Sequence, residues 1–157
     1  MKFFSNKLYQ EITGAELAPV LNAITLAKEM GVWVEITNLI IPTINDDPVM
    51  IRRLCRWLYK NTGRETPLHF SRFAPRYKLK NLPPTPVETL FQARDIAMEV
   101  GLDYVYVGNI YSPLGENTHC PNCKKMLIKR IGFQVLEKHI NRSRCKFCRT
   151  LIPGVFP

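Results

Sequence analysis

Residues 17–42 read LAPVLNAITLAKEMGVWVEITNLIIP and contain a complete helix-to-strand unit. Apolar side chains recur at helical spacing from Leu17 to Met30, and Gly31 supplies the stop signal. The stretch from Val32 to Ile41 is rich in β-branched residues and is closed by Pro42, as is typical of a strand. The sequence therefore predicts an amphipathic helix followed by a long strand.

The same order of elements recurs twice downstream. Asp47-Pro48 has the residue types of a helix cap and first turn, and a short strand is predicted at Pro67–Ser71. Thr85–Glu88 has the pattern of a capping box before a third helix, and Asp103–Asn109 reads as the third strand. Consecutive helix–strand units imply parallel strands joined by right-handed crossovers, so we expect an α/β layer or barrel segment.

The alternation of side chains within the strands suggests a polar inner face. Helices should cover the apolar face of the first strand, which is interrupted only by Asn38 and consists of Val32, Val34, Ile36 and Ile40. This leaves Glu35 and Thr37 on the opposite face. In the second strand, the same argument places His69 and Ser71 on that opposite face. Because polar residues rarely line the packed interior of a barrel, we expect a cavity for a polar ligand.

Carboxyl-terminal strand ends are the usual functional edge of such folds, and here they present Asn45, Asp46, His69–Arg72 and Gly108-Asn109. Structural alternatives stay open for several of these side chains. His69 can be a hydrogen-bonded structural residue, and Asn45-Asp46-Asp47 can serve turn and cap chemistry. Glu35 can form an ion pair with a basic residue of a missing strand, and Cys55 fits a helix core position.

Two CxxC motifs, Cys120–Cys123 and Cys145–Cys148, are separated by 21 residues. Each CxxC motif forms a tight turn, or knuckle, that presents two thiolates, so two knuckles can complete a tetrahedron around a metal. The residues between them read as strand, turn and strand, with Gly132 at the turn. This spacing predicts a zinc-ribbon-like module at residues 115–157, after a first domain at residues 1–114. A rubredoxin-like iron site remains an alternative, although Lys124 and Arg149 stand where such sites usually have glycine.

Positive charge is concentrated in the last third of the chain. The whole sequence has 22 Lys and Arg against 13 Asp and Glu, and residues 112–157 hold 9 of the former and 2 of the latter. This balance is compatible with nucleic-acid binding, but four thiolates around one metal also need nearby cations. We therefore do not expect nucleic acid as the main partner. No stretch resembles a membrane span or a signal peptide, so we expect a cytoplasmic protein with reduced cysteines.

Three segments near the start of the chain carry a first resemblance to a known family: Gly14–Leu21, Lys28–Pro42 and Asn45–Asp47. They resemble radical S-adenosylmethionine (SAM) enzymes related to pyruvate formate-lyase activating enzymes. Later segments narrow the resemblance, namely Leu68–Phe73, Tyr77–Leu79, Leu82–Pro86, Tyr104–Asn109, Gly115–Thr118 and the closing Cys-rich region. Together, the segments resemble the C-terminal half of the radical SAM member of the AmmeMemoRadiSam system.

The resemblance implies a partial (β/α) TIM-like barrel, of which this chain supplies about three strands with outer helices. It also implies that Lys2, Thr37 and His69 lie near adenosylmethionine. Family members hold a [4Fe-4S] cluster on a CxxxCxxC motif, and that motif is absent from this sequence. The chain alone is therefore expected to be inactive, and it would need an N-terminal, cluster-binding partner half.

The basic loop at residues 72–84 would lie over the barrel mouth and could meet a protein or anionic substrate. The alternative to an enzyme half is a stand-alone zinc-ribbon protein that binds nucleic acid or a protein partner through its basic tail. A non-functional gene remnant is a third interpretation.

Overall fold

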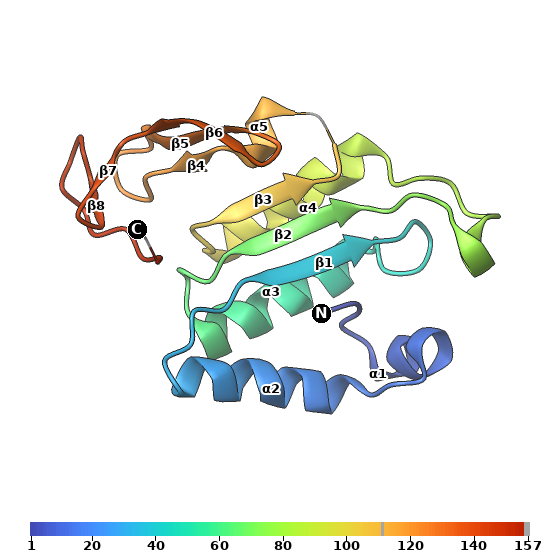
Figure 1. Cartoon of the computed structure of the whole chain (residues 1–157). Coiled ribbons are helices and arrows are strands. Elements are labelled where there is room, and N and C mark those ends of the chain that lie inside the picture. Colours follow the sequence, from blue (N-terminus) through green and yellow to red (C-terminus); the bar gives the residue numbers. More distant parts are fainter. Residues whose placement is uncertain (111, 156–157) are drawn as a thin grey trace.

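A computed structural model describes residues 1–110 and 112–155 of the chain. Figure 1 shows a small parallel sheet with helices α2, α3 and α4 on one side and a Cys-rich ribbon beside the opposite face. The chain is thus a mixed α/β fold followed by a short β-rich module.

The sheet part alternates helices and strands. Asp47 caps the longest helix, because its carboxylate accepts hydrogen bonds from the backbone amides of Val49 and Met50, both at 3.2 Å. The elements of this part are α1 (Asn6–Leu8), a π-helical turn (Tyr9–Thr13), α2 (Leu17–Glu29), β1 (Ile36–Ile40), α3 (Pro48–Thr62), β2 (Leu68–Arg72), a 3-10 turn (Tyr77–Leu79), α4 (Val87–Val100) and β3 (Val105–Gly108).

The strands lie in the order β1-β2-β3, and both pairings are parallel, as predicted. Thr37 pairs in register with His69, and His69 pairs with Tyr106, so these three side chains form a row across one face. One edge of β1 pairs with β2, and its opposite edge pairs with no strand in the described part of the chain. The described residues therefore form an open three-stranded sheet, and they do not close a barrel.

The first strand is shorter than the sequence suggested. It begins at Ile36, and Val32 lies outside it with half of its surface exposed (51%), so the prediction of a covered Val32 was wrong. Within the strand the predicted alternation is confirmed, because Ile36, Asn38 and Ile40 are buried and Thr37 is exposed. The buried Asn38 amide donates to the backbone carbonyl oxygens of Met1 and Lys2 at 3.1 and 3.0 Å, which explains a polar residue on the helix side.

The capping box predicted at Thr85–Glu88 does not form. Helix α4 begins at Val87, and among the described side chains none caps its first turn. The fully buried Thr85 hydroxyl instead donates to the carbonyl oxygen of Ile40 (2.6 Å) and accepts from the amide of Phe73 (2.8 Å). Thr85 therefore connects the ends of β1 and β2. Its hydroxyl satisfies two buried backbone groups, which would otherwise lack partners, and so it is not available to cap the helix.

The core lies between the sheet and the helices. It comprises Ile24, Ile36, Ile40, Ile51, Leu54, Cys55, Leu58, Leu68, Phe70, Leu90, Ala93, Ile96, Ala97, Leu102, Val105 and Val107. Cys55 is fully buried within it, as predicted, and burial raises the pKa of its thiol to about 12. A second, smaller cluster joins Phe3 and Tyr9 to Ile41 and Phe73 at the carboxyl ends of β1 and β2.

The Cys-rich part follows a short helix, α5 (Pro113–Glu116). Strands β5 and β6 form the hairpin that the sequence predicted, with Gly132 in its turn at a positive φ of 57°. The strands of this part are β4 (Thr118–His119), β5 (Met126–Ile131), β6 (Gln134–Lys138), β7 (Ile140–Asn141) and β8 (Arg144–Cys145), and their pairings are antiparallel.

Candidate functional site

The four cysteines of the two CxxC motifs lie together. Their Sγ atoms are all within 4.8 Å of one another, with 3.6 Å between Cys120 and Cys148 and 3.8 Å between Cys123 and Cys145. Cys120 and Cys145 are fully buried, whereas Cys123 and Cys148 are partly exposed. The two motifs are thus brought into one four-cysteine group from opposite ends of the ribbon.

The spacing of the sulfurs fits a single tetrahedral metal ion. A metal–sulfur bond of about 2.3 Å gives a sulfur–sulfur edge of about 3.8 Å in a tetrahedron. The two closest pairs already have this separation, which is too short to enclose a multi-iron cluster. The four-cysteine group could therefore hold one metal ion, such as zinc or iron.

The two knuckles have matching backbone geometry. The amide of Lys124 donates to the carbonyl oxygen of Cys120 at 3.0 Å, and that of Arg149 donates to Cys145 at 2.9 Å. Lys124 and Arg149 both adopt left-handed φ angles, 61° and 65°, at the position where iron sites of this kind usually have glycine. The absence of glycine therefore does not prevent the knuckle turn.

Local groups influence the thiols in opposite ways. Burial raises the pKa of Cys120 to about 12, so a cation is needed to hold its thiolate form near neutral pH. Hydrogen bonds from the hydroxyl and the backbone amide of Thr150 lower the pKa of Cys148 to about 6. The Cys148 thiol can thus be ionised near neutral pH before a metal binds, whereas the Cys120 thiolate needs the charge of the bound metal.

A second cluster of functional side chains lies on the open face of the sheet. The imidazole Nε2 of His69 is 2.9 Å from Glu35 Oε2, and the Trp33 indole donates to Glu35 Oε1 at 3.0 Å. The His69 ring stacks on Tyr106, with 4.9 Å between ring centroids. Glu35 therefore has partners within this chain, and an ion pair with a missing strand is not needed to satisfy its two oxygens.

Glu35 is held in its ionised form. Partial burial by itself raises the pKa of this carboxyl, but hydrogen bonds from Trp33 and His69 outweigh it, with smaller contributions from the charges of His69 and Arg130. The net effect is a pKa below the ordinary value. The carboxylate can therefore fix one nitrogen of the imidazole ring and leave the other for a ligand.

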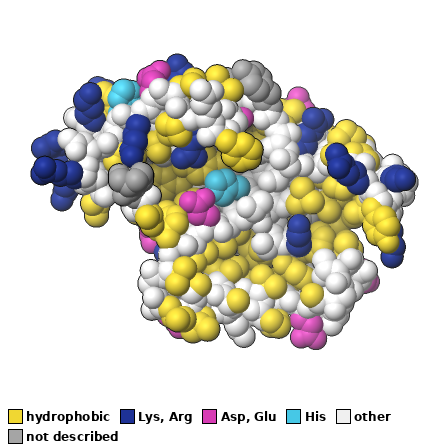
Figure 2. Space-filling model, viewed as in Figure 1, with side chains coloured by type: hydrophobic (Ala, Val, Ile, Leu, Met, Phe, Trp, Pro, Cys, Tyr) yellow, Lys and Arg dark blue, Asp and Glu magenta, His cyan; other side chains and the backbone are white. Residues whose placement is uncertain are grey.

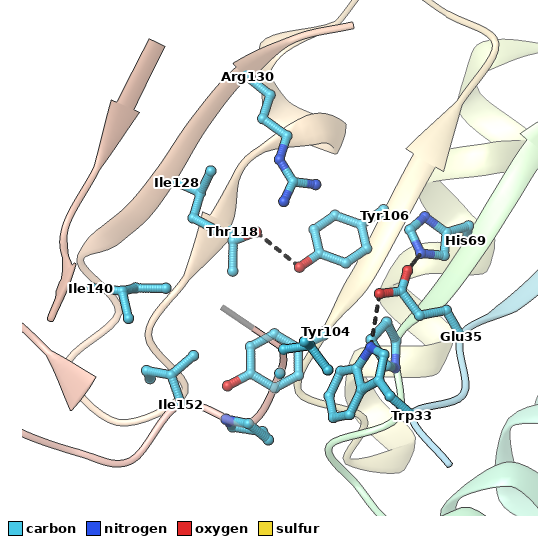
Figure 3. Close-up of a pocket in the computed structure, with 14 residues that line it drawn as sticks. Trp33, Glu35, His69, Tyr104, Tyr106, Thr118, Ile128, Arg130, Ile140 and Ile152 are labelled. Atoms are coloured by element: carbon cyan, nitrogen blue, oxygen red, sulfur yellow. Dashed lines mark hydrogen bonds and ion pairs between the residues drawn. The ribbon is translucent and has the colours of Figure 1, made fainter. Parts of the chain in front are cut away.

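These groups line a cavity of about 220 Å³ between the sheet and the ribbon. Figure 3 shows Trp33, Glu35, His69 and Tyr106 on the sheet side, with Thr118, Ile128 and Arg130 facing them from the ribbon. The Tyr106 hydroxyl and the Thr118 hydroxyl are 2.9 Å apart across this boundary. His69, Tyr106 and Arg130 also line a second, larger hollow of about 660 Å³ that extends to Phe133 at the hairpin tip. Figure 2 shows the hollowed surface between the ribbon and the sheet.

The predicted ligand-contacting residues fall into two places. Thr37 and His69 are neighbours in register on the open face, and the Thr37 side chain is exposed. His69 is the second residue of β2, so the prediction that it lies at the carboxyl-terminal edge of the strands was wrong. Lys2 lies at the edge of β1, with its backbone amide bonded to the Tyr9 hydroxyl (2.8 Å) and its side chain exposed. Among the expected edge residues, Asn45 is structural, because its amide oxygen accepts from Ile41 and its nitrogen donates to Leu39 and Lys2.

Sequence reasoning missed the residues that complete the cavity. Tyr104 lies just before β3, Tyr106 lies within β3, and Arg130 lies in the ribbon hairpin. These side chains line one cavity only because of how the ribbon packs on the sheet. The alternation in the third strand could have placed both tyrosines on the open face. Nothing in the sequence places Arg130 opposite Glu35.

Fold and site together define an α/β sheet with one open, polar face and an adjoining ribbon whose four-cysteine group could hold a metal ion. No protein-family model matches this chain. In the part of the chain that the structure describes, no helix has the length and apolar character needed to cross a membrane.

One curated relative is an uncharacterized protein from Methanocaldococcus jannaschii, MJ0808, which is 49% identical over 142 residues. The match covers 89% of this chain but 43% of the relative, so the chain spans less than half the length of that protein. Among solved structures, the fold is similar to a domain of a pyruvate-formate lyase-activating enzyme from Bacteroides vulgatus, with a TM-score of 0.58 and 17% identity. This similarity covers 69% of this chain and 64% of that structure, and it shows a shared fold.

Proposed function

We propose that this chain is the C-terminal half of a radical SAM enzyme of the activating-enzyme type, specifically the one in the AmmeMemoRadiSam system. Its open sheet face would line the cavity for adenosylmethionine and substrate. The missing strands and the cluster would come from an N-terminal half. In this proposal residues 1–114 form the half-barrel and residues 115–157 form the zinc ribbon.

The main supporting observation is the row of side chains across the parallel sheet. Thr37, His69 and Tyr106 stand side by side on the face that no helix covers, and β1 has a long edge without a strand partner in the described residues. An unpaired parallel strand is a site where another chain or segment can add a strand. The fold similarity to a domain of an activating enzyme agrees with this interpretation.

The chain's own residues would bind and orient the cofactor. The Thr37 hydroxyl can accept or donate a hydrogen bond to ribose hydroxyls, and the free ring nitrogen of His69 can bond a ribose or carboxylate oxygen. Glu35 fixes the ring through Nε2, and stacking on Tyr106 fixes its plane. The Lys2 ammonium, at the β1 edge, would add a positive charge near an anionic group.

The cluster does not fit this chain. Four of its five cysteines form the four-cysteine group, and the fifth, Cys55, is buried among apolar side chains. The [4Fe-4S] cluster, and with it the reductive cleavage of adenosylmethionine, would therefore be supplied by the partner half.

Zinc is the proposed metal of the four-cysteine group. Four thiolates fill every position of a tetrahedral site, so none is left for a substrate or water, and this is the pattern of a structural zinc ion. Such a metal would hold the ribbon together and take no part in the reaction.

Co-expression with a chain that carries CxxxCxxC tests the proposal. We expect a brown complex that cleaves adenosylmethionine when a reductant is added, and His69→Ala should weaken cofactor binding while the zinc content stays at one per chain. Cys55→Ala is the matched control, because it removes a thiol that the proposal assigns no role.

A chain that stays monomeric and stable beside such a partner, with no cleavage, would contradict the proposal. Metal analysis of the purified chain separately decides between zinc and iron.

A further inference from the structure

The cavity between sheet and ribbon lies at the amino-terminal ends of the strands. Trp33, Pro67 and Tyr104, which line it, precede β1, β2 and β3 respectively. Parallel α/β folds usually bind their main ligand at the opposite, carboxyl-terminal ends. The cavity therefore lies at the other end of the strands from that usual edge, and it shares His69 and Tyr106 with the row of side chains in the proposed function.

Arg130 presents unused hydrogen-bond donors to this cavity. Figure 3 shows its guanidinium group pointing from β5 toward Tyr106 and Thr118. Within residues 1–110 and 112–155, its side chain makes no hydrogen bond or salt bridge, although the side chain is partly buried. A guanidinium group has five N–H donors in a planar fork that matches a carboxylate.

Tyr104 also carries a hydroxyl without an acceptor, but this oxygen atom is buried and has no surface open to the cavity. The residue is 5% exposed, and its hydroxyl has no hydrogen-bond partner in the described part of the chain. A buried hydroxyl without a partner destabilises the folded state, so most such groups are satisfied in folded proteins. Tyr104 and Arg130 line the same cavity at different places (Figure 3).

The other residues that line the cavity restrict the shape and the charge of a ligand that could bind there. Trp33 and Tyr106 offer aromatic surfaces, and the ribbon adds Ile128, Ile140 and Ile152. Both oxygens of Glu35 already accept hydrogen bonds, from Trp33 and from His69. A negative charge on this wall disfavours a doubly charged phosphate more than a singly charged carboxylate.

We propose that this cavity binds a small aromatic carboxylate, with its carboxylate on Arg130 and its ring against the aromatic surfaces of Trp33 and Tyr106. The cavity volume of about 220 Å³ suits a single-ring acid. The ribbon thereby contributes a binding residue to the sheet, beyond its role as a metal-held module.

A titration of the zinc-loaded, nitrogen-15-labelled chain with para-hydroxyphenylacetate tests this site. The chain has two tryptophans, and the Trp33 indole lines the cavity while Trp57 packs against Phe4 in the helical layer. We expect the Trp33 indole signal to move in a saturable way and the Trp57 signal to stay. Equal shifts of both signals, or none in either, would overturn the proposal.

Ligand variants separate the chemistry of binding. The neutral para-hydroxyphenylacetamide should bind at least about tenfold more weakly, because it loses the charge-assisted bond to Arg130, and inorganic phosphate should not displace the acid. If the amide binds as well as the acid, or phosphate competes on equal terms, the assignment of a carboxylate is wrong.

Protein variants test the role of Arg130. Arg130→Gln should weaken binding of the acid by about ten- to a hundredfold, the range for charge-assisted hydrogen bonds. Arg130→Lys keeps the positive charge and should lose less affinity for the acid than Arg130→Gln. If the Gln variant folds poorly, the Lys variant tests the role of Arg130. Tyr104→Phe should leave the affinity for the acid unchanged, because the buried hydroxyl does not reach the cavity.

The matched control is Arg142→Gln, which removes a positive charge from an exposed ribbon turn and should leave the affinity as it is. Unchanged affinity in both Arg130 variants would overturn the proposal.

Discussion

The sheet part and the four-cysteine ribbon are stabilised by different means. Sixteen buried residues form a continuous core between the sheet and its helices. The ribbon's cluster has six, of which Tyr104 belongs to the sheet part and Cys120 and Cys145 are thiols. Only Leu127, Ile128 and Ile152 remain as aliphatic core residues of the ribbon in this cluster. Burial of apolar surface can therefore hold the sheet, whereas the proposed metal ion would have to supply much of the stability of the ribbon.

Removal of the metal should have the largest effect, and it should be confined to the ribbon. Binding of a structural zinc ion is worth about 10–16 kcal/mol in small zinc-dependent domains, so chelation or Cys145→Ser should unfold residues 118–152. Hydrogen exchange should show loss of amide protection in β5 and β6 and its retention in β2 and α4. Cys55→Ala should keep the metal. Persistent protection of β5 and β6 in the metal-free chain would show that the ribbon has a sufficient core of its own.

Truncation of a core side chain should destabilise the sheet part and leave the metal in the ribbon, the reverse of metal removal. Phe70 is fully buried in the middle strand, and Phe70→Ala should cost about 3–5 kcal/mol of unfolding free energy, because it leaves a cavity that the packed helices cannot fill. Phe133 at the hairpin tip is fully exposed, and Phe133→Ala should change stability by less than about 0.5 kcal/mol. Denaturant unfolding measures both, and each variant should keep its metal. Similar losses in the two variants would mean that the hairpin tip is packed in solution.

The smallest effect concerns the boundary between the two regions and depends on pH. The pKa of Glu35 is lowered in the folded chain, so its contribution to stability is present above the ordinary pKa of 4.5 and is lost as pH falls through the lower, folded value. Because half of the Glu35 side chain is exposed, solvent screening keeps the effect small.

Glu35→Gln should therefore reduce the loss of thermal stability between neutral and acidic pH, and the exposed Glu29→Gln should not. Melting curves across this pH range would measure the difference. An identical pH profile in the Glu35 variant and the parent chain would mean that the contacts with Trp33 and His69 do not form in solution.

Several features of the fold could be predicted because they depend on local patterns. Gly31 lies just after α2, where the sequence predicted the stop of that helix, and the four cysteines of the two CxxC motifs lie together as their spacing predicted. Strand boundaries were less predictable, because Val32 has strand-like chemistry but no strand partner in the described part of the chain. The role of Thr85 was mistaken, since its long-range bonds to Ile40 and Phe73 have no local signature.

The sequence by itself determined the parallel helix–strand order, the open polar face with Thr37 and His69, and the four-cysteine group. These follow from periodicity and spacing, which act over a few residues or within one module. Only the tertiary structure decided that Glu35 pairs with His69 and that Arg130 faces it across a cavity with Tyr104. That arrangement depends on how the ribbon packs on the sheet, and side chains far apart in the chain meet only when two folded parts come into contact.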